Sequence, residues 1–167
     1  YENGHDGIAR DYLQAIQWFQ KAVDQGDLAA KVDLAMVYIN GHGVARDYSK
    51  AAELLEDPAE AGLPQAQYQL GALYEKGEDG RFQDFTKAAE WLTRAANQNQ
   101  TQAQFDLGDL YFNGQGLHQS YEEAYFWYSL AAKAGKPPAW ADALRRYLSA
   151  EKIAAIEKRV SDWKATE

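Results

Sequence analysis

Alanine, leucine and tyrosine recur at helical spacing in three successive segments of the chain. An alanine is followed by a leucine four positions later, a small residue at the fifth position and a tyrosine at the eighth. The residues are Ala30, Leu34, Ala35 and Tyr38; Ala66, Leu70, Gly71 and Tyr74; and Ala103, Leu107, Gly108 and Tyr111. These offsets lie on one helical face and predict three amphipathic helices. Glycine within a helix costs about 1 kcal/mol relative to alanine, so Gly71 and Gly108 indicate close approach of another helix.

A second apolar pattern occurs four times and predicts a second helix in each copy. Its residues are Ala15, Trp18, Phe19 and Ala22; Ala51, Leu54 and Leu55; Ala88, Trp91, Leu92 and Ala95; and Ala124, Trp127, Tyr128 and Ala131. A residue that tolerates left-handed backbone closes each copy, at Gly26, Gly62, Asn99 and Gly135. In the second copy Asp57-Pro58-Ala59-Glu60 has the form of a helix start, so we expect that helix to break near Asp57 and resume as one short turn.

The two helices of a copy are joined by a glycine-containing segment that also occurs four times. Its versions are NGHDGIARDYLQA from Asn3, NGHGVARDYSKA from Asn40, KGEDGRFQDFTKA from Lys76 and NGQGLHQSYEEA from Asn113. The glycines suit the end of the first helix. The residues suited to cap the second helix are Asp11, Asp47, Asp84 and Ser120, the last in a capping box with Glu123. Fourfold recurrence indicates architecture rather than a reactive site.

The tyrosines set the period of the repeat. Tyr1, Tyr38, Tyr74 and Tyr111 are 37, 36 and 37 residues apart. The pattern therefore predicts an all-α chain of about four repeats, at residues 1–27, 28–63, 64–100 and 101–136, of which the first is truncated. Because the chain opens at Tyr1, in the middle of a copy, we expect further sequence upstream.

The period is lost after residue 136, and residues 137–167 are predicted to form capping helices. Trp140, Leu144, Tyr147 and Leu148 suggest one helix. A final helix capped by Ser149 places four apolar residues on one face: Ile153, Ile156, Val160 and Trp163. The open end of a repeat array needs such an atypical unit to cover it.

Composition narrows the class of partner. The 167 residues carry a formal net charge of −8 without a basic stripe, which argues against a nucleic acid partner. No apolar run reaches the roughly 18 residues of a membrane span, so membrane insertion is not expected. Cysteine is absent, which removes thiol chemistry but leaves the compartment open.

Candidate chemical groups are few and dispersed. His5 and His42 occupy equivalent loops and His118 follows a third, so one repeat translation separates successive loops and no metal site is expected. The acidic residues Asp57, Glu60, Glu122 and Glu123 lie at predicted helix starts, where they complement the helix dipole. We predict no catalytic residue and no cofactor.

The repeated unit A-x-x-x-L-G-x-x-Y-x-x-G-x-G, followed by D-x-x-x-A-x-x-W-x-x-x-A-A-x-x-G, closely resembles the Sel-one-like repeat, a relative of the tetratricopeptide repeat. The resemblance covers residues 1 to about 136, and the tail LSAEKIAAIEKRVSDW resembles the closing segment of bacterial members. It implies a right-handed α-solenoid of antiparallel helix pairs with a C-terminal capping helix. It also implies protein recognition by an adaptor, scaffold or inhibitor, without chemistry. Family habit points to the bacterial periplasm, with the cytoplasm as an alternative.

In tetratricopeptide-like solenoids the first helix of each unit lines the concave surface. Carried onto this sequence, the resemblance places these residues there: Val32, Met36, Ile39 and Asn40; Tyr68, Ala72, Glu75 and Lys76; and Phe105, Asp109, Phe112 and Asn113. The apolar ones form a strip suited to a protein or peptide segment. Asn40 and Asn113 are suited to form hydrogen bonds with the backbone of the bound segment. The alternative for each apolar residue of the strip is that it packs in the core.

Two other functions are compatible with the sequence. The pairs Ser149–Lys152 and Ser161–Lys164 have the Ser-x-x-Lys spacing of penicillin-recognising enzymes, and some family members are linked to penicillin binding. The companion Ser-Asp-Asn and Lys-Thr-Gly motifs are missing. The third possibility is a structural spacer whose apolar strip is covered by upstream repeats or by self-association with a second copy.

Overall fold

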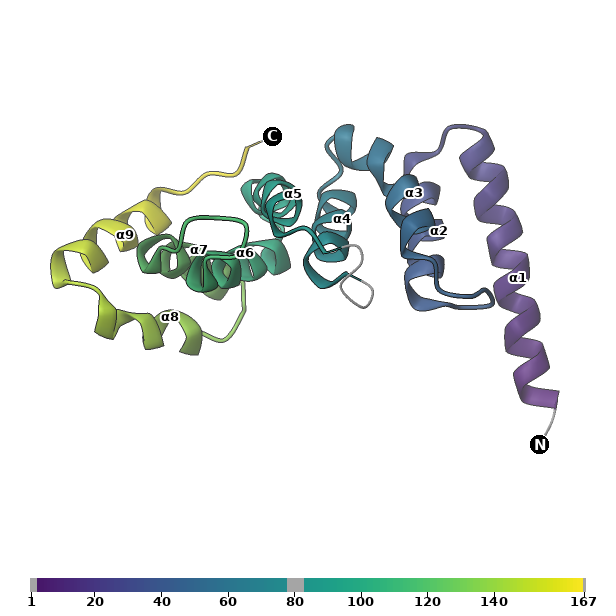
Figure 1. Ribbon diagram of the computed structural model, residues 1–167. Coiled ribbons are helices and arrows are strands. Elements are labelled where there is room, and N and C mark those ends of the chain that lie inside the picture. Colours follow the sequence, from purple (N-terminus) through teal and green to yellow (C-terminus); the bar gives the residue numbers. More distant parts are fainter. Residues whose placement is uncertain (1–2, 78–82, 167) are drawn as a thin grey trace. The chain divides into compact units, whose positions relative to one another are not determined.

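The computed structural model describes residues 3–77 and 83–166, and side chains within these ranges from residue 12 onward. Every regular element in the described ranges is a helix, which confirms the all-α prediction (Figure 1). The elements are α1 (Asn3–Asp24), α2 (Leu28–Asn40), α3 (Tyr48–Glu60), α4 (Pro64–Lys76), α5 (Phe85–Asn97), α6 (Thr101–Asn113), α7 (Tyr121–Lys133), α8 (Ala139–Leu144), the 3-10 helix η1 (Arg145–Tyr147) and α9 (Ala150–Asp162).

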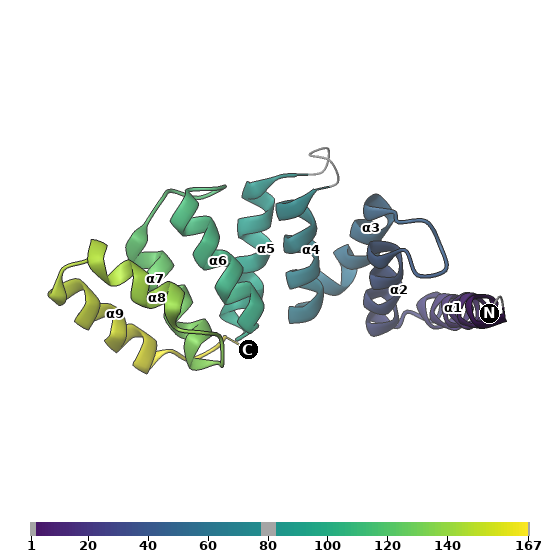
Figure 2. The ribbon, with the colours of Figure 1, turned by 90° about the horizontal axis from the view of Figure 1, so that it is seen from below.

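The chain forms two compact units, Tyr1–Leu70 and Gly71–Glu167, which are described separately. In the N-terminal unit, α2 packs against both α1 and α3. In the C-terminal unit, α6 packs between α5 and α7, while α7 also contacts α8 and α9 (Figures 1 and 2).

The predicted alanine and leucine positions form the core of each unit. Leu34 and Leu55 are at most 1% exposed in the N-terminal unit, and Leu92 and Leu107 are fully buried in the C-terminal one. Each such leucine contributes about 1.5–3 kcal/mol through burial. A Cβ added to Gly108 would lie 2.7 Å from the ring of Tyr128, so the predicted close helix approach is confirmed there.

The loops between paired helices are held at both ends. Gly41 and Gly114 end α2 and α6 in left-handed conformation, as predicted. Asp47, Asp84 and Ser120 cap the following helices with their side chains. The N–H of each of these three residues also donates to the repeat tyrosine's carbonyl: Asp47 to Tyr38 at 3.1 Å, Asp84 to Tyr74 at 2.8 Å and Ser120 to Tyr111 at 3.0 Å. Asp27 and Gln100, which the sequence pattern did not single out, cap α2 and α6.

The hydrogen bond from the Ser120 N–H to the Tyr111 carbonyl changes the predicted capping box of Ser120 and Glu123. The Glu123 N–H donates to Ser120 Oγ at 3.2 Å, as expected. The Ser120 N–H, however, is satisfied by the Tyr111 carbonyl, and the Glu123 carboxylate pairs with Arg159 instead. Only half of the box therefore forms.

The predicted loop in the first copy is wrong, because α1 continues from Asn3 to Asp24. In later copies the loop is fixed by the hydrogen bond to the repeat tyrosine, whose counterpart here is Tyr1, outside the described residues. A helical glycine costs only about 1 kcal/mol, so glycine does not end a helix without such contacts.

The predicted break near Asp57 is also wrong, because α3 runs through Pro58 to Glu60. Pro58 lies in the last turn, where its missing N–H removes a single intrahelical bond. Its ring is among the most completely buried side chains and occupies the core position that alanine holds in the other copies. Burial offsets the lost bond at this place in the helix.

The expected C-terminal cap is present. Ser149 Oγ accepts the Lys152 N–H at 3.3 Å and starts α9. Ile156 is 3% exposed, and the ring of Trp163 lies 5.6 Å from Phe126 and 5.5 Å from Trp127. These contacts cover the side of α7 that would otherwise end the array in solvent.

Candidate functional site

The first helices of the repeats are α2, α4 and α6, and the surface formed by their predicted contact residues is called here the first-helix face. In the N-terminal unit these residues differ in how much of each side chain is exposed. Val32 is 8% exposed and belongs to the core. Met36 and Ile39 are half-buried and Asn40 is exposed, so these three remain accessible to a partner. Tyr68, on α4, is also half-buried.

The corresponding residues of the C-terminal unit are mostly half-buried. This holds for Glu75 on α4 and for Phe105, Asp109 and Phe112 on α6, while Asn113 is exposed. Of their two neighbours on α4, Ala72 is 8% exposed and Lys76 lies in solvent.

Phe105 belongs to an aromatic cluster. Its ring lies 5.3 Å from that of Tyr128 on α7 and 6.0 Å, edge-on, from that of Trp140 on α8. Such aromatic pairs contribute roughly 0.5–1.5 kcal/mol beyond burial. Phe105 therefore helps to hold α8 in place. Trp140 is 55% exposed, so part of its ring is accessible to solvent.

Phe112 belongs to a second set of aromatic rings, together with Tyr121 and Tyr147. It lies 5.7 Å from Tyr121, which stacks 5.0 Å from Tyr147 of η1. Between the two sets lies a groove of about 190 Å³, called here the aromatic groove, which is lined by Phe112, Tyr128, Trp140, Ala143, Leu144, Arg146 and Tyr147.

Three carboxylates interact electrostatically with one another and are called here the acidic group: Glu75, Asp106 and Asp109. Tyr128 donates its hydroxyl hydrogen to Asp109 Oδ1 at 2.6 Å, which connects the group to a groove residue. Gln102 Nε2 donates to Asp106 Oδ1, also at 2.6 Å. Glu75 interacts electrostatically with both aspartates.

The surroundings raise the pKa of all three carboxyl groups. Burial, followed by repulsion from Asp106, raises the pKa of Glu75 to about 7, although Lys76 acts in the opposite direction. Burial is also the main cause of the raised pKa of Asp106 and of Asp109, against the lowering effect of their hydrogen bonds from Gln102 and Tyr128. The surroundings of the acidic group therefore disfavour the charged form of each carboxyl group.

Sequence reasoning selected only part of this site. The sequence pattern puts Tyr128 in a second helix and Trp140 and Tyr147 in the cap, which separates them from the predicted contact residues. Asp106 lies between Phe105 and Asp109, which the resemblance selects, but is not itself selected. No pattern in the sequence brings these residues together. In the structure Trp140 and Tyr147 are 55% and 51% exposed and line the same groove.

His42 and His118 lie in loops, whereas the backbone of His5 belongs to α1. The His42 ring stacks on Tyr12 at 4.9 Å, and His118 is exposed. The side chain of His5 lies outside the described residues. Within the described ranges, no three histidine, cysteine or carboxylate side chains are grouped as metal ligands.

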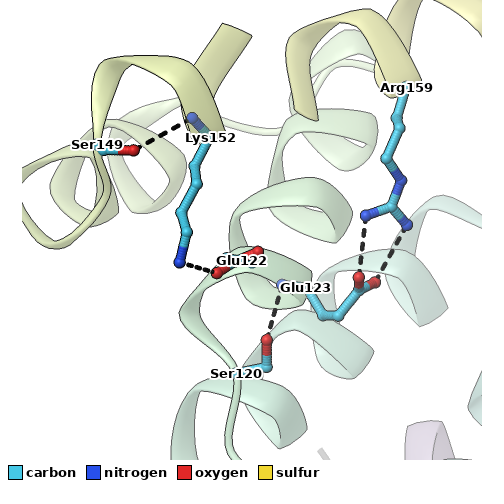
Figure 3. Close-up of polar contacts among 6 residues, drawn as sticks. All are labelled: Ser120, Glu122, Glu123, Ser149, Lys152 and Arg159. Atoms are coloured by element: carbon cyan, nitrogen blue, oxygen red, sulfur yellow. Dashed lines mark hydrogen bonds and ion pairs between the residues drawn. The ribbon is translucent and has the colours of Figure 1, made fainter. Parts of the chain in front are cut away.

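Ser149 caps α9, and the side chain of Lys152 forms an ion pair with Glu122 (Figure 3). The serine hydroxyl accepts the Lys152 backbone N–H, while Lys152 Nζ pairs with Glu122 of α7. The lysine amine is thereby directed to a carboxylate rather than to the serine. Ser161 and Lys164, the other such pair, are both exposed.

Of the four carboxylates predicted at helix starts, Glu122 and Glu123 lie in the first turn of α7, whereas Asp57 and Glu60 lie in the last turn of α3, so the prediction is wrong for these two. Glu122 pairs with Lys152 and Glu123 with Arg159, so both connect α7 to α9 (Figure 3). Asp57, at the end of α3, pairs with Lys31 of α2.

No helix in the described part of the chain is long and apolar enough to cross a bilayer.

Comparison with known proteins identifies the repeats. The Sel1 repeat model matches residues 1–27, 28–62, 64–100 and 101–136. The similar solved structures include a protective antigen present in uropathogenic Escherichia coli strains, with an SLR fold, at a TM-score of 0.82 and 28% identity over 98% of this chain. A Sel1 repeat protein from Oxalobacter formigenes matches at 0.65 and 36% identity over 77% of this chain. No curated protein matches the sequence.

The extent of these matches differs. The alignments cover 35% and 36% of those two proteins, so this chain spans about a third of their length. Helicobacter pylori cysteine-rich protein B matches at a TM-score of 0.60 and 21% identity, over 79% of this chain and 94% of that one, and shares the fold alone. The fold is an all-α solenoid of this class, as the sequence predicted.

Proposed function

Because the chain belongs to the Sel1 repeat family, whose fold is commonly a protein–protein interaction module, we propose that it binds a segment of another protein or peptide on its first-helix face. The role is that of an adaptor, scaffold or inhibitor rather than an enzyme. The observation that carries the proposal is the aromatic groove beside α6, where Trp140 and Tyr147 are about half exposed around an apolar opening. Aromatic side chains in such openings are common anchors of protein interfaces.

The accessible residues of the N-terminal unit suit the same role. Met36 and Ile39 present partly accessible apolar surface on α2, and the exposed Asn40 ends that helix. An amide side chain beside apolar surface provides hydrogen bonds to the backbone of a bound segment.

The test is partner capture followed by titration. The immobilised chain is used to retain proteins from the source organism, and mass spectrometry identifies them. A retained partner is then titrated against Trp140→Ala, which should weaken binding strongly because an exposed aromatic anchor is removed. The matched control is Trp18→Ala on α1, since Trp18 is 69% exposed and lies outside the proposed contact residues.

The outcomes separate the alternatives. Equal binding by both variants, with unchanged helical circular dichroism, would refute the proposed face. A concentration-dependent dimer in light scattering that is lost in Trp140→Ala would assign the face to a second copy of the chain instead.

A further inference from the structure

We propose that the C-terminal unit selects a cationic protein segment, whose large apolar side chain enters the aromatic groove while its lysine or arginine side chains lie against Glu75, Asp106 and Asp109. This inference rests on the proposed function and specifies the chemistry of the partner. It concerns residues of one unit only, on α4, α6, α7 and α8.

The first support is a difference in how the unit treats its carboxylates. Glu122 and Glu123 of α7 are paired with Lys152 and Arg159 of α9, and Glu157 of α9 is paired with Arg145 of η1. None of the three carboxylates of the acidic group is in an ion pair with any described residue. Among the described residues, these three glutamates have a cationic partner and the acidic group has none, so we infer that its charge is suited to an external cation.

The second support is that this charge is held against an electrostatic cost. Glu75 of α4 interacts electrostatically with Asp106 and Asp109, which are both on α6. Tyr128 of α7 donates a hydrogen bond to Asp109. The positive groups nearby are Lys76 on α4 itself and Lys136 after α7, which moderate the pKa of Asp106 without removing its upward shift. A bound cation would relieve the repulsion, so binding energy is available to a positively charged segment and not to an acidic one.

Lys136 is occupied by other contacts. Its Nζ lies 5.6 Å from the centre of the Phe105 ring and donates to Gln102 Oε1. It is therefore held beside the acidic group by the aromatic cluster rather than paired with a carboxylate.

The third support is the polarity of the groove. Arg146 lies at the η1 side, with its guanidinium 4.8 Å from the centre of the Tyr147 ring and a 2.8 Å hydrogen bond to the Tyr147 hydroxyl. The acidic group is connected to the groove through Tyr128, which lines the groove and donates to Asp109 of α6. A bound segment is thus oriented with its positive charges towards α4 and α6 and its apolar side chain towards α8.

Peptide selection tests the inference without requiring the natural partner. A random-peptide phage library is selected on the wild-type chain, and synthetic versions of the enriched peptides are titrated. We expect them to combine lysine or arginine with a large apolar residue and to bind more weakly as salt rises.

The key variant is Glu75→Gln with Asp106→Asn and Asp109→Asn. Amides keep the hydrogen-bond acceptors for Gln102 and Tyr128, so the fold is retained while the charge is removed. The control is Glu90→Gln with Glu151→Gln and Asp162→Asn, three exposed carboxylates of the same unit with the same total change in charge. Affinity should fall at least about tenfold in the first variant and at most about twofold in the control.

Calorimetry supplies a readout that general charge attraction does not. A cation beside Glu75 lowers its pKa, which is about 7 in the free protein, so binding near neutral pH should release protons. The binding enthalpy should then depend on the ionisation enthalpy of the buffer, and Glu75→Gln should abolish that dependence.

Two failures are distinguishable. Neutral or acidic peptides that need Trp140 but bind equally to both triple variants would overturn this inference and leave the proposed function intact. If no peptide binds, or if Trp140→Ala has no effect on those that do, the proposed function falls together with the inference.

Discussion

Gly116 lies directly against the backbone of Phe85, so closely that an added Cβ would be 2.0 Å from the Phe85 carbonyl oxygen. Gly116 is the second glycine of the loop between α6 and α7, and Phe85 is the first residue of α5, in the preceding repeat. The same relationship recurs in the N-terminal unit, where a Cβ on Gly43 would lie 2.8 Å from Tyr12 Cβ. The repeated glycine loop therefore connects neighbouring repeats, which explains its recurrence without a chemical role.

Gly116→Ala should destabilise the protein by about 2–4 kcal/mol, since it combines left-handed backbone strain with a backbone clash. The matched control is Gly135→Ala, because Gly135 also has a positive φ (+105°) but has no atom within 4 Å of an added Cβ. That change should cost only about 1 kcal/mol. Urea unfolding followed by circular dichroism measures both. Equal losses would show that the loop does not pack as described.

Glu75→Gln should stabilise the protein at alkaline pH. The pKa of Glu75 rises from 4.5 to about 7 on folding, so the folded state binds this proton more tightly than the unfolded state does. Stability contributed by the group is then present below about pH 4.5 and is lost as pH rises through about 7. The amide removes that loss. Because the side chain is only half-buried, solvent screening limits the gain to about 1 kcal/mol.

Urea unfolding of wild type and Glu75→Gln at about pH 8, 6 and 4 checks this expectation. The two curves should differ most at the highest pH and converge at the lowest, where Glu75 is protonated in both states. The exposed Glu90→Gln is the control and should show no such trend. A constant difference across the range would mean that Glu75 is not desolvated in the fold.

Ser149→Ala should cost about 1 kcal/mol through loss of the α9 cap, and Ser149→Asp should restore most of it. Thermal unfolding measures the series. The structural role also predicts that a labelled penicillin does not acylate Ser149, because the partner lysine is bound to Glu122. Labelling of the wild type that disappears in Ser149→Ala would overturn the proposed non-enzymatic role.

Sequence reasoning was most successful where the physics is local. The caps at Asp47, Asp84 and Ser149 depend on side chains that reach backbone N–H groups two or three residues away, and all three form. Gly26, Gly62, Asn99 and Gly135 all adopt the positive φ expected at the ends of the second helices. The same reasoning failed at Pro58, because its burial in the core outweighed the local cost of proline in a helix.

The face proposed for binding shows the same limit. The family resemblance implied that both Val32 and Met36 lie on the contact face, but only packing determined that Val32 is 8% exposed while Met36 stays accessible. Trp140 joined the groove because α8 folds back onto α7, an arrangement that no pattern within α8 specifies.

The sequence by itself determined the period, the helix pairs of the last three repeats and the caps of their second helices, since these depend on backbone preferences and hydrogen bonds between residues a few positions apart. Only the tertiary structure brought Glu75 to Asp106 and Asp109, and Tyr128 to Trp140. Those neighbours come from different helices, and their spacing depends on how closely the helices pack, as at Gly108 against Tyr128. Packing also sets the burial that raises the pKa values of the acidic group, and these are the properties from which its partner is inferred.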